Sequence, residues 1–104
     1  MQIQDRIAPV HPGEILLADV LEPLGLSRKR FAALLGVSAG RINAIVRGRR
    51  AISADTAVRL GKCLGTSPSF WLGLQTEYDL QIAKDALANR IDNEVTVLRP
   101  PKAA

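Results

Sequence analysis

The 104-residue chain lacks several features that mark whole classes of protein. Its single cysteine, Cys63, excludes an intramolecular disulfide and a zinc site built from several cysteines. No apolar run approaches the ~20 residues that a membrane-spanning helix needs. The first ten residues lack the basic-then-apolar order of a secretion signal. We therefore expect a soluble, cytoplasmic protein that does not contact a membrane.

Catalytic and metal-binding groups are scarce as well. His11 is the only histidine, and because a metal site would need more ligands, we expect it to be a helix cap or a surface residue. Cys63 lies near Leu60 and Leu64 in a helical pattern, so we expect it to be a buried, small apolar residue. No nucleophile has a histidine partner, and no glycine-rich phosphate loop is present. The sequence therefore predicts that the protein is not an enzyme and holds no metal or cofactor.

Acidic residues are nearly absent from the middle of the chain. Residues 27–62 contain nine basic residues and one acid, Asp55, which gives this segment a charge of +8. The rest of the chain has five basic and nine acidic residues, a charge of −4. The basic middle suits a polyanion such as DNA, whereas the acidic ends suit water or a basic protein.

Apolar residues recur at helical spacing in five segments, which predict helices over residues 13–24, 28–35, 39–47, 54–64 and 68–88. The last four helices each follow a serine that can cap them, and we expect Pro23 and Gly25 to close the first. The residues expected to face the core are Leu16, Leu17, Val20, Leu21, Leu24, Phe31, Leu34, Leu35, Ile42, Ile45, Val46, Ala57, Leu60, Leu64, Phe70, Trp71, Leu74 and Tyr78.

Both ends of the chain have a different character. Residues 1–10 form an N-terminal extension in which residues 2–4 alternate and can be extended. Residues 91–104 form a C-terminal tail in which the β-branched, alternating segment EVTVL (residues 94–98) favours an extended backbone and can be a strand. A single domain over residues 11–90 separates the two.

The second and third predicted helices have the spacing of a helix-turn-helix. Ala32 lies where the helices would cross, Gly36 follows in the turn, and Ile42 would fill the angle between the helices. A plain helical hairpin would share this spacing, but the +8 charge favours a DNA-binding motif. The fold class is therefore all-α: a compact five-helix domain with termini that can be extended.

In this motif the start of the third helix enters the major groove. With Ile42, Ile45 and Val46 buried, the side facing the bases is expected to carry Ala39, Gly40, Arg41, Asn43, Ala44 and Arg47. Small side chains at the tip allow a close approach to the bases; Asn43 suits adenine, and Arg41 or Arg47 suits guanine. The groups expected at DNA phosphates lie at the capped helix starts and after the third helix: Ser27, Arg28, Lys29, Arg30, Ser38, Arg49 and Arg50.

The stretch FAALLGVSAGRINAIVRGRR (residues 31–50) resembles the Cro and phage-repressor type of helix-turn-helix, the lambda-repressor-like fold. The flanking segments HPGEIL (residues 11–16), ISADTAVRLGK (52–62), GTSPSFWLGLQ (65–75) and YDL (78–80) resemble the HigA antitoxins of bacterial toxin–antitoxin modules. The chain departs from that family at Gly40, where members often carry a polar residue, and this leaves the operator sequence open.

The resemblance implies a homodimer that binds a palindromic double-stranded operator, represses its own operon, and neutralises a HigB-type ribonuclease toxin that cuts mRNA. Because such a toxin must hold RNA, its surface should be basic. Three acids on the outer side of the first helix are therefore the expected toxin-binding residues: Glu14, Asp19 and Glu22. The alternative is that these acids only balance charge for solubility. The alternative is a stand-alone helix-turn-helix regulator without a toxin, which the neighbouring reading frame would distinguish.

Overall fold

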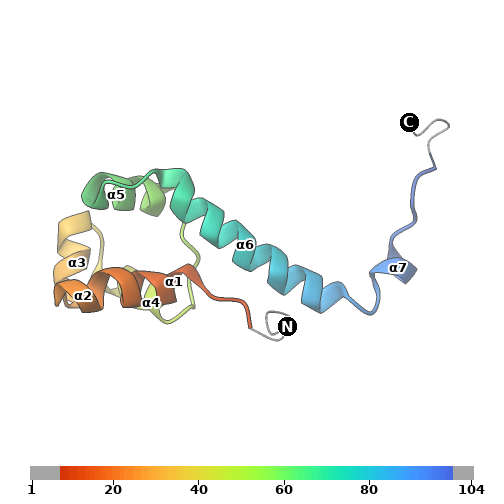
Figure 1. Ribbon diagram of the computed structural model, residues 1–104, viewed down its shortest axis with the longest axis horizontal. Helices are drawn as coiled ribbons and strands as arrows, with labels where there is room; N and C mark the ends of the chain where they lie inside the picture. The colour runs from red at the N-terminus through yellow and green to blue at the C-terminus, as the bar shows by residue number, and fades with distance from the viewer. Residues whose placement is uncertain (1–7, 100–104) are drawn as a thin grey trace.

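The computed structural model describes residues 8–99, and their regular secondary structure is entirely helical (Figure 1). The elements in chain order are α1 (Pro12–Leu16), η2 (Leu17–Leu21), α2 (Glu22–Leu24), α3 (Arg28–Leu35), α4 (Ala39–Val46), α5 (Ala54–Leu64), α6 (Pro68–Leu87) and α7 (Ile91–Glu94). Residues 2–4, which were expected to be extended, lie outside the described residues.

A serine caps the start of each of the helices α3, α4, α5 and α6. Ser27, Ser38, Ser53 and Ser67 each accept a hydrogen bond from the backbone N–H three residues later, at 3.0–3.2 Å. Each cap satisfies one of the N–H groups that a helix start leaves without a partner. The predicted bounds of α3 and α5 are confirmed, and α4 ends one residue earlier than predicted.

The first helix departs from its predicted course. It runs without a break from Pro12 to Leu24, but residues 17–21 form a π-helical turn in which the Glu22 N–H bonds to the Leu17 carbonyl. Pro23, predicted to close the helix, lies inside it, because the wider turn accommodates a ring that would clash in a regular α-helix. The helix ends at Gly25 (φ 63°). The changed register buries Leu16 and Leu21, five residues apart, and leaves Leu24 exposed.

The core lies where α1 to α5 meet the first half of α6. Its buried apolar residues are Leu16, Leu21, Phe31, Ala32, Leu35, Ile42, Ile45, Val46, Ile52, Ala57, Leu60 and Trp71. The predicted buried stripe of α4 (Ile42, Ile45 and Val46) is therefore confirmed.

Four apolar residues were wrongly predicted to be buried: besides Leu24, the side chains of Leu34, Cys63 and Phe70 are exposed. Leu34 and Cys63 lie just outside the buried stripes of α3 and α5, where they line the same surface groove. Phe70 lies beside buried Trp71 and packs edge-on against its indole, with ring centroids 5.1 Å apart. Successive residues of a helix are rotated by about 100° around its axis. A residue next to a buried one in the sequence can therefore lie at the edge of the buried stripe, where it is exposed.

Gly13 allows α1 to pack closely against α4. A Cβ atom placed on Gly13 would lie 1.8 Å from the carbonyl oxygen of Ile45, a distance that no side chain can occupy. Pro12 supplies the fixed φ angle that suits a first helical turn. The HPGEIL segment therefore sets how closely α1 packs on α4.

The long helix α6 is anchored only through its first half. Trp71 is buried and its Nε1 donates to the Thr66 hydroxyl at 2.8 Å. Gln75 is also buried: its Oε1 accepts from the Ile52 backbone N–H at 2.8 Å, and its Nε2 donates to Asp79 at 2.9 Å. The second half projects away from the other helices (Figure 1). The radius of gyration is accordingly 17.8 Å, against ~13 Å for a compact chain of 100 residues.

The C-terminal tail contains a short helix instead of the strand that its sequence favours. Helix α7 covers Ile91–Glu94, and Val95 then adopts an extended conformation (φ −111°, ψ 125°). No described residue forms a strand, because an extended segment needs a partner for its backbone hydrogen bonds. Across residues 8–99, no helix combines the length and apolar character needed to cross a membrane.

The buried amide of Gln75 leads to a stability prediction. Gln75→Leu keeps the side-chain volume but leaves the Ile52 N–H without its partner. The free energy of unfolding should fall by about 1–3 kcal/mol. Gln81→Leu is the matched control, because Gln81 makes the same contact to an aspartate four residues later but is exposed. Urea denaturation of both variants tests this, and an equal loss in both would contradict it.

Candidate nucleic-acid interface

Helices α3 and α4 form the helix-turn-helix that the spacing predicts. Ala32 is buried where the two helices pack, and Ile42 is fully buried between them. Gly36 has φ 72°, a left-handed conformation that glycine adopts at little cost. Its N–H and that of Val37 bond back to the last turn of α3, so the turn is short and closed.

The residues expected to face the bases divide into two groups. Ala39, Gly40 and Arg47 are exposed, whereas Ala44 is half-buried. Arg41 and Asn43 are half-buried and already engaged with other side chains. The freely presented surface of α4 therefore has a small, smooth N-terminal turn and an arginine at its far end.

The residues expected at phosphates surround that surface. Lys29 and Arg30 are exposed on the first turn of α3, and Arg49 and Arg50 are exposed after α4. Arg28 is half-buried because its Nη1 donates to the Asn43 Oδ1 at 2.6 Å. Ser27 and Ser38 use their hydroxyl oxygens as helix caps, which leaves other backbone N–H groups of those two helix starts to meet an anion.

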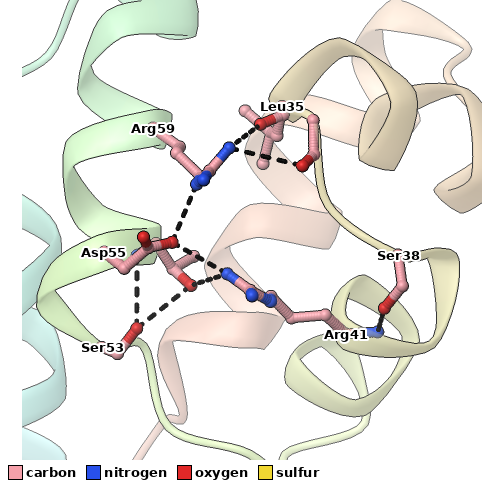
Figure 2. A network of polar contacts seen from close by, with 8 residues as sticks. Leu35, Ser38, Arg41, Ser53, Asp55 and Arg59 are labelled. Atoms are coloured by element: carbon pink, nitrogen blue, oxygen red, sulfur yellow. Dashed lines mark hydrogen bonds and ion pairs between the residues drawn. The ribbon is translucent and has the colours of Figure 1, made fainter.

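The one acid of the basic segment lies at the centre of a polar network that joins three helices (Figure 2). Asp55, on α5, accepts at Oδ1 from Arg41 of α4 at 2.9 Å and from Arg59 of α5 at 2.8 Å. Arg59 also donates to the carbonyls of Leu35 and Gly36, at 2.9 and 3.3 Å. The end of α3 and the first turn of α4 are thus both tied to α5.

This network assigns positioning roles that the sequence reasoning missed. Arg41 has only a quarter of its side chain exposed, and its guanidinium also lies 3.4 Å from the Thr56 hydroxyl. Hydrogen bonds from Arg59 and Arg41 lower the pKa of the Asp55 carboxyl from its ordinary 3.8. A single acid within a basic segment, four residues before an arginine, is the signal that could have revealed this pair.

His11 supports the loop that follows α4. Its Nδ1 accepts from the Gly13 N–H at 2.9 Å, which confirms the expected cap, but the side chain is buried and does not lie on the surface. A Cβ atom on Gly48 would lie 3.7 Å from the imidazole, and the Tyr78 ring packs edge-on at 4.9 Å. Burial lowers the pKa of His11 from 6.5, against raising effects from Asp79, Glu14 and a hydrogen bond with the Arg50 backbone. The His11 imidazole therefore links α1, α6 and the loop that carries Arg49 and Arg50.

The acids expected to bind a toxin are available at the surface. Glu14, Asp19 and Glu22 are all exposed along the α1–η2–α2 helix. Within residues 8–99, no three histidine, cysteine, aspartate or glutamate side chains gather closely enough to hold a metal ion.

The Asp55 network leads to a pH-dependent prediction. Because folding lowers the pKa of this carboxyl, its stabilising contribution is present above the ordinary pKa and is lost as the pH falls through the folded-state pKa. Asp55→Asn should therefore lower the melting temperature at pH 7, and the difference from the parent should shrink as the pH falls below about 4 and disappear once the pH is below the folded-state pKa. Glu94→Gln, which breaks a peripheral ion pair with Arg90, is the control. A deficit that persists unchanged at low pH would refute the assignment.

Known proteins resemble the chain across these elements. A helix-turn-helix family model matches residues 17–71, from η2 into the first turn of α6. Antitoxin HigA-1 of Vibrio cholerae is 33% identical over 92 residues, which cover 88% of this chain and 83% of that protein.

Two solved structures share both fold and sequence with the chain. The Pseudomonas aeruginosa antitoxin HigA, solved with the higBA promoter, is 45% identical with a TM-score of 0.83, over 88% of this chain and 99% of that one. Antitoxin GraA in complex with its operator is 41% identical with a TM-score of 0.83, over 90% and 95%. The family model spans the helix-turn-helix, and both of these relatives are antitoxins solved with promoter or operator DNA. The chain therefore belongs to the HigA family of helix-turn-helix antitoxins.

Proposed function

We propose that the protein is an antitoxin that binds a palindromic operator as a homodimer, represses its own operon, and neutralises a HigB-type ribonuclease toxin. The observation that carries the DNA-binding part is the surface of α4. The first turn of α4 carries the small, exposed residues Ala39 and Gly40, and exposed basic residues lie on both sides of it. Such a helix start suits insertion into a major groove. The promoter and operator complexes of the two relatives support the same proposal.

Gly40 is the residue in this surface that most needs explaining. It lies in the first turn of α4, is exposed, and has no positive φ angle to require glycine. A Cβ atom there would meet only the Ser38 hydroxyl, at 3.9 Å. Since glycine in a helix costs up to about 1 kcal/mol relative to alanine, the protein retains a cost that its own packing does not demand. Close approach to a DNA base edge accounts for it.

A dimer follows from the size of the motif. One protomer presents one recognition helix, so a palindromic operator with half-sites about one helical turn apart needs two. The basic segment cannot be the contact, because like charges would face each other. The projecting half of α6 and the tail carry the exposed apolar residues Leu80, Ile82, Ile91 and Val95, which suit burial against a second copy.

The toxin-binding part rests on charge separation. Residues 27–62 carry +8 and the remainder −4, and the exposed acids of α1 to α2 belong to that remainder. An acidic surface steers a basic ribonuclease toward the antitoxin and raises the association rate, especially at low salt. DNA and toxin could then be held on surfaces of opposite charge.

The DNA-binding proposal is tested by Gly40→Ala. The added methyl group should stabilise the fold by about 0.5–1 kcal/mol and weaken binding to the operator upstream of the protein's own gene by roughly 1–3 kcal/mol through overpacking at the base edges. Gly73→Ala is the matched control: Gly73 is an exposed glycine within α6 with no atom near its Cβ position, so it should stabilise the fold without changing DNA binding. Operator affinity unchanged by Gly40→Ala would contradict the proposed approach.

The toxin-binding proposal is tested by removing charge without changing shape. The triple variant Glu14→Gln, Asp19→Asn, Glu22→Gln should associate with the toxin encoded by the neighbouring reading frame roughly ten-fold more slowly at low salt. A second triple variant (Asp85→Asn, Asp92→Asn and Glu94→Gln) removes the same charge from the other end of the molecule and should have a smaller effect. Operator binding serves as the internal control for folding. Equal slowing by both triples would mean that total charge matters and this surface does not.

A further inference from the structure

The shortest side-chain contact between the two helices of the motif joins Arg28 to Asn43. Arg28 is the first residue of α3, and Asn43 lies in the middle of α4. The Arg28 Nη1 donates to the Asn43 Oδ1 at 2.6 Å, a short and charge-assisted bond. Both side chains are half-buried, so the contact lies at the edge of the surface that α4 presents.

This bond fixes what the asparagine can offer to DNA. A side-chain amide has an oxygen that accepts through two lone pairs and a nitrogen that carries two donors. The oxygen already faces a guanidinium, which carries only donors. The groups left over on the two side chains are therefore the Nδ2 hydrogens of Asn43, the remaining N–H groups of Arg28 and one lone pair of the amide oxygen. Donors outnumber the single acceptor site.

Adenine and guanine present different hydrogen-bonding groups in the major groove. Adenine presents an acceptor and a donor, so the usual bidentate contact from asparagine needs the amide oxygen as well as the nitrogen. Guanine presents two acceptors, N7 and O6, side by side. A pair that offers several donors, some of them charged, matches the two acceptors of guanine better than the acceptor and donor of adenine.

The neighbouring arginine does not compete for this role. Arg41, the basic residue in the first half of α4, is held by Asp55. Arg28 has its hydrogen bond to a neutral amide, and therefore keeps its full positive charge for DNA.

We propose that Arg28 and Asn43 act as one unit that reads a guanine in each half of the operator. This inference rests on the proposed DNA-binding function. It replaces the adenine expected for an isolated Asn43, and it gives Arg28 a part in base recognition as well as a charge near the phosphates.

The experiment selects DNA from a pool of random duplexes with the full-length protein and sequences what is bound. The parent should enrich a palindrome with a guanine in each half-site that depends on the pair. Arg28→Ala and Asn43→Ala should each reduce discrimination at that same position by roughly ten-fold or more. The double variant should lose little beyond either single variant, because the two residues act together.

Arg30→Ala is the matched control, since it removes the same charge from the same turn of α3, where Arg30 is exposed. It should weaken binding to all sequences and keep the guanine preference. Discrimination is a ratio measured within one variant, so a partly unfolded sample does not change it.

Three results would overturn the proposal while leaving operator binding intact. These are an adenine at the position that depends on Asn43, relaxation of different positions by the two single variants, and a preference that survives Arg28→Ala. If the parent enriches no sequence at all, the proposed DNA-binding function fails and this inference fails with it.

Discussion

The carboxylate of Asp55 joins the two helices of the motif to the helix behind them. Arg59 carries its positive charge to the carbonyls at the end of α3, where the helix dipole is negative, and Arg41 brings in the first turn of α4. One acid thus restrains both partners in the helix-turn-helix. Because it engages two of the nine basic residues of the segment, seven remain outside this network: those at the start of α3, those after α4, and Lys62 on α5.

Signals from adjacent residues predicted most of the helix boundaries. Serine caps and closing glycines are properties of adjacent residues, and they gave the bounds of α3 and α5 and nearly those of α4. The π-helical turn was missed because it depends on how the fold accommodates Pro23 within a helix. Leu34, Cys63 and Phe70 were misplaced because hydrophobicity does not report the angular limits of a buried stripe. The engagement of Arg41 and Asn43 was missed for a related reason: their partners, Asp55 and Arg28, lie on other helices, and only the packing brings them together.

The segments that carry the family resemblance are mostly structural. His11 and Gly13 fit α1 against α4 and the following loop, and Trp71 and Gln75 hold α6 to the core. None of these four is on the surface that α4 presents. The residues that hold the helices together are therefore separate from the exposed residues of α4. One fold can then serve different operators when those exposed residues change.

Because only the first half of α6 is held by the core, the free energy of local unfolding should fall along this helix from its first turns to its last. Opening the turn around Trp71 and Gln75 exposes core and breaks a buried hydrogen bond, so it costs a large part of the global unfolding free energy. Opening the turns after Leu80 breaks only backbone bonds that already face water, and such segments exchange their amide hydrogens through low-energy local unfolding. An isolated protomer is thus firm at one end of α6 and frays at the other. Any molecule that covers the projecting end would lengthen the lifetime of its helical state without touching the core.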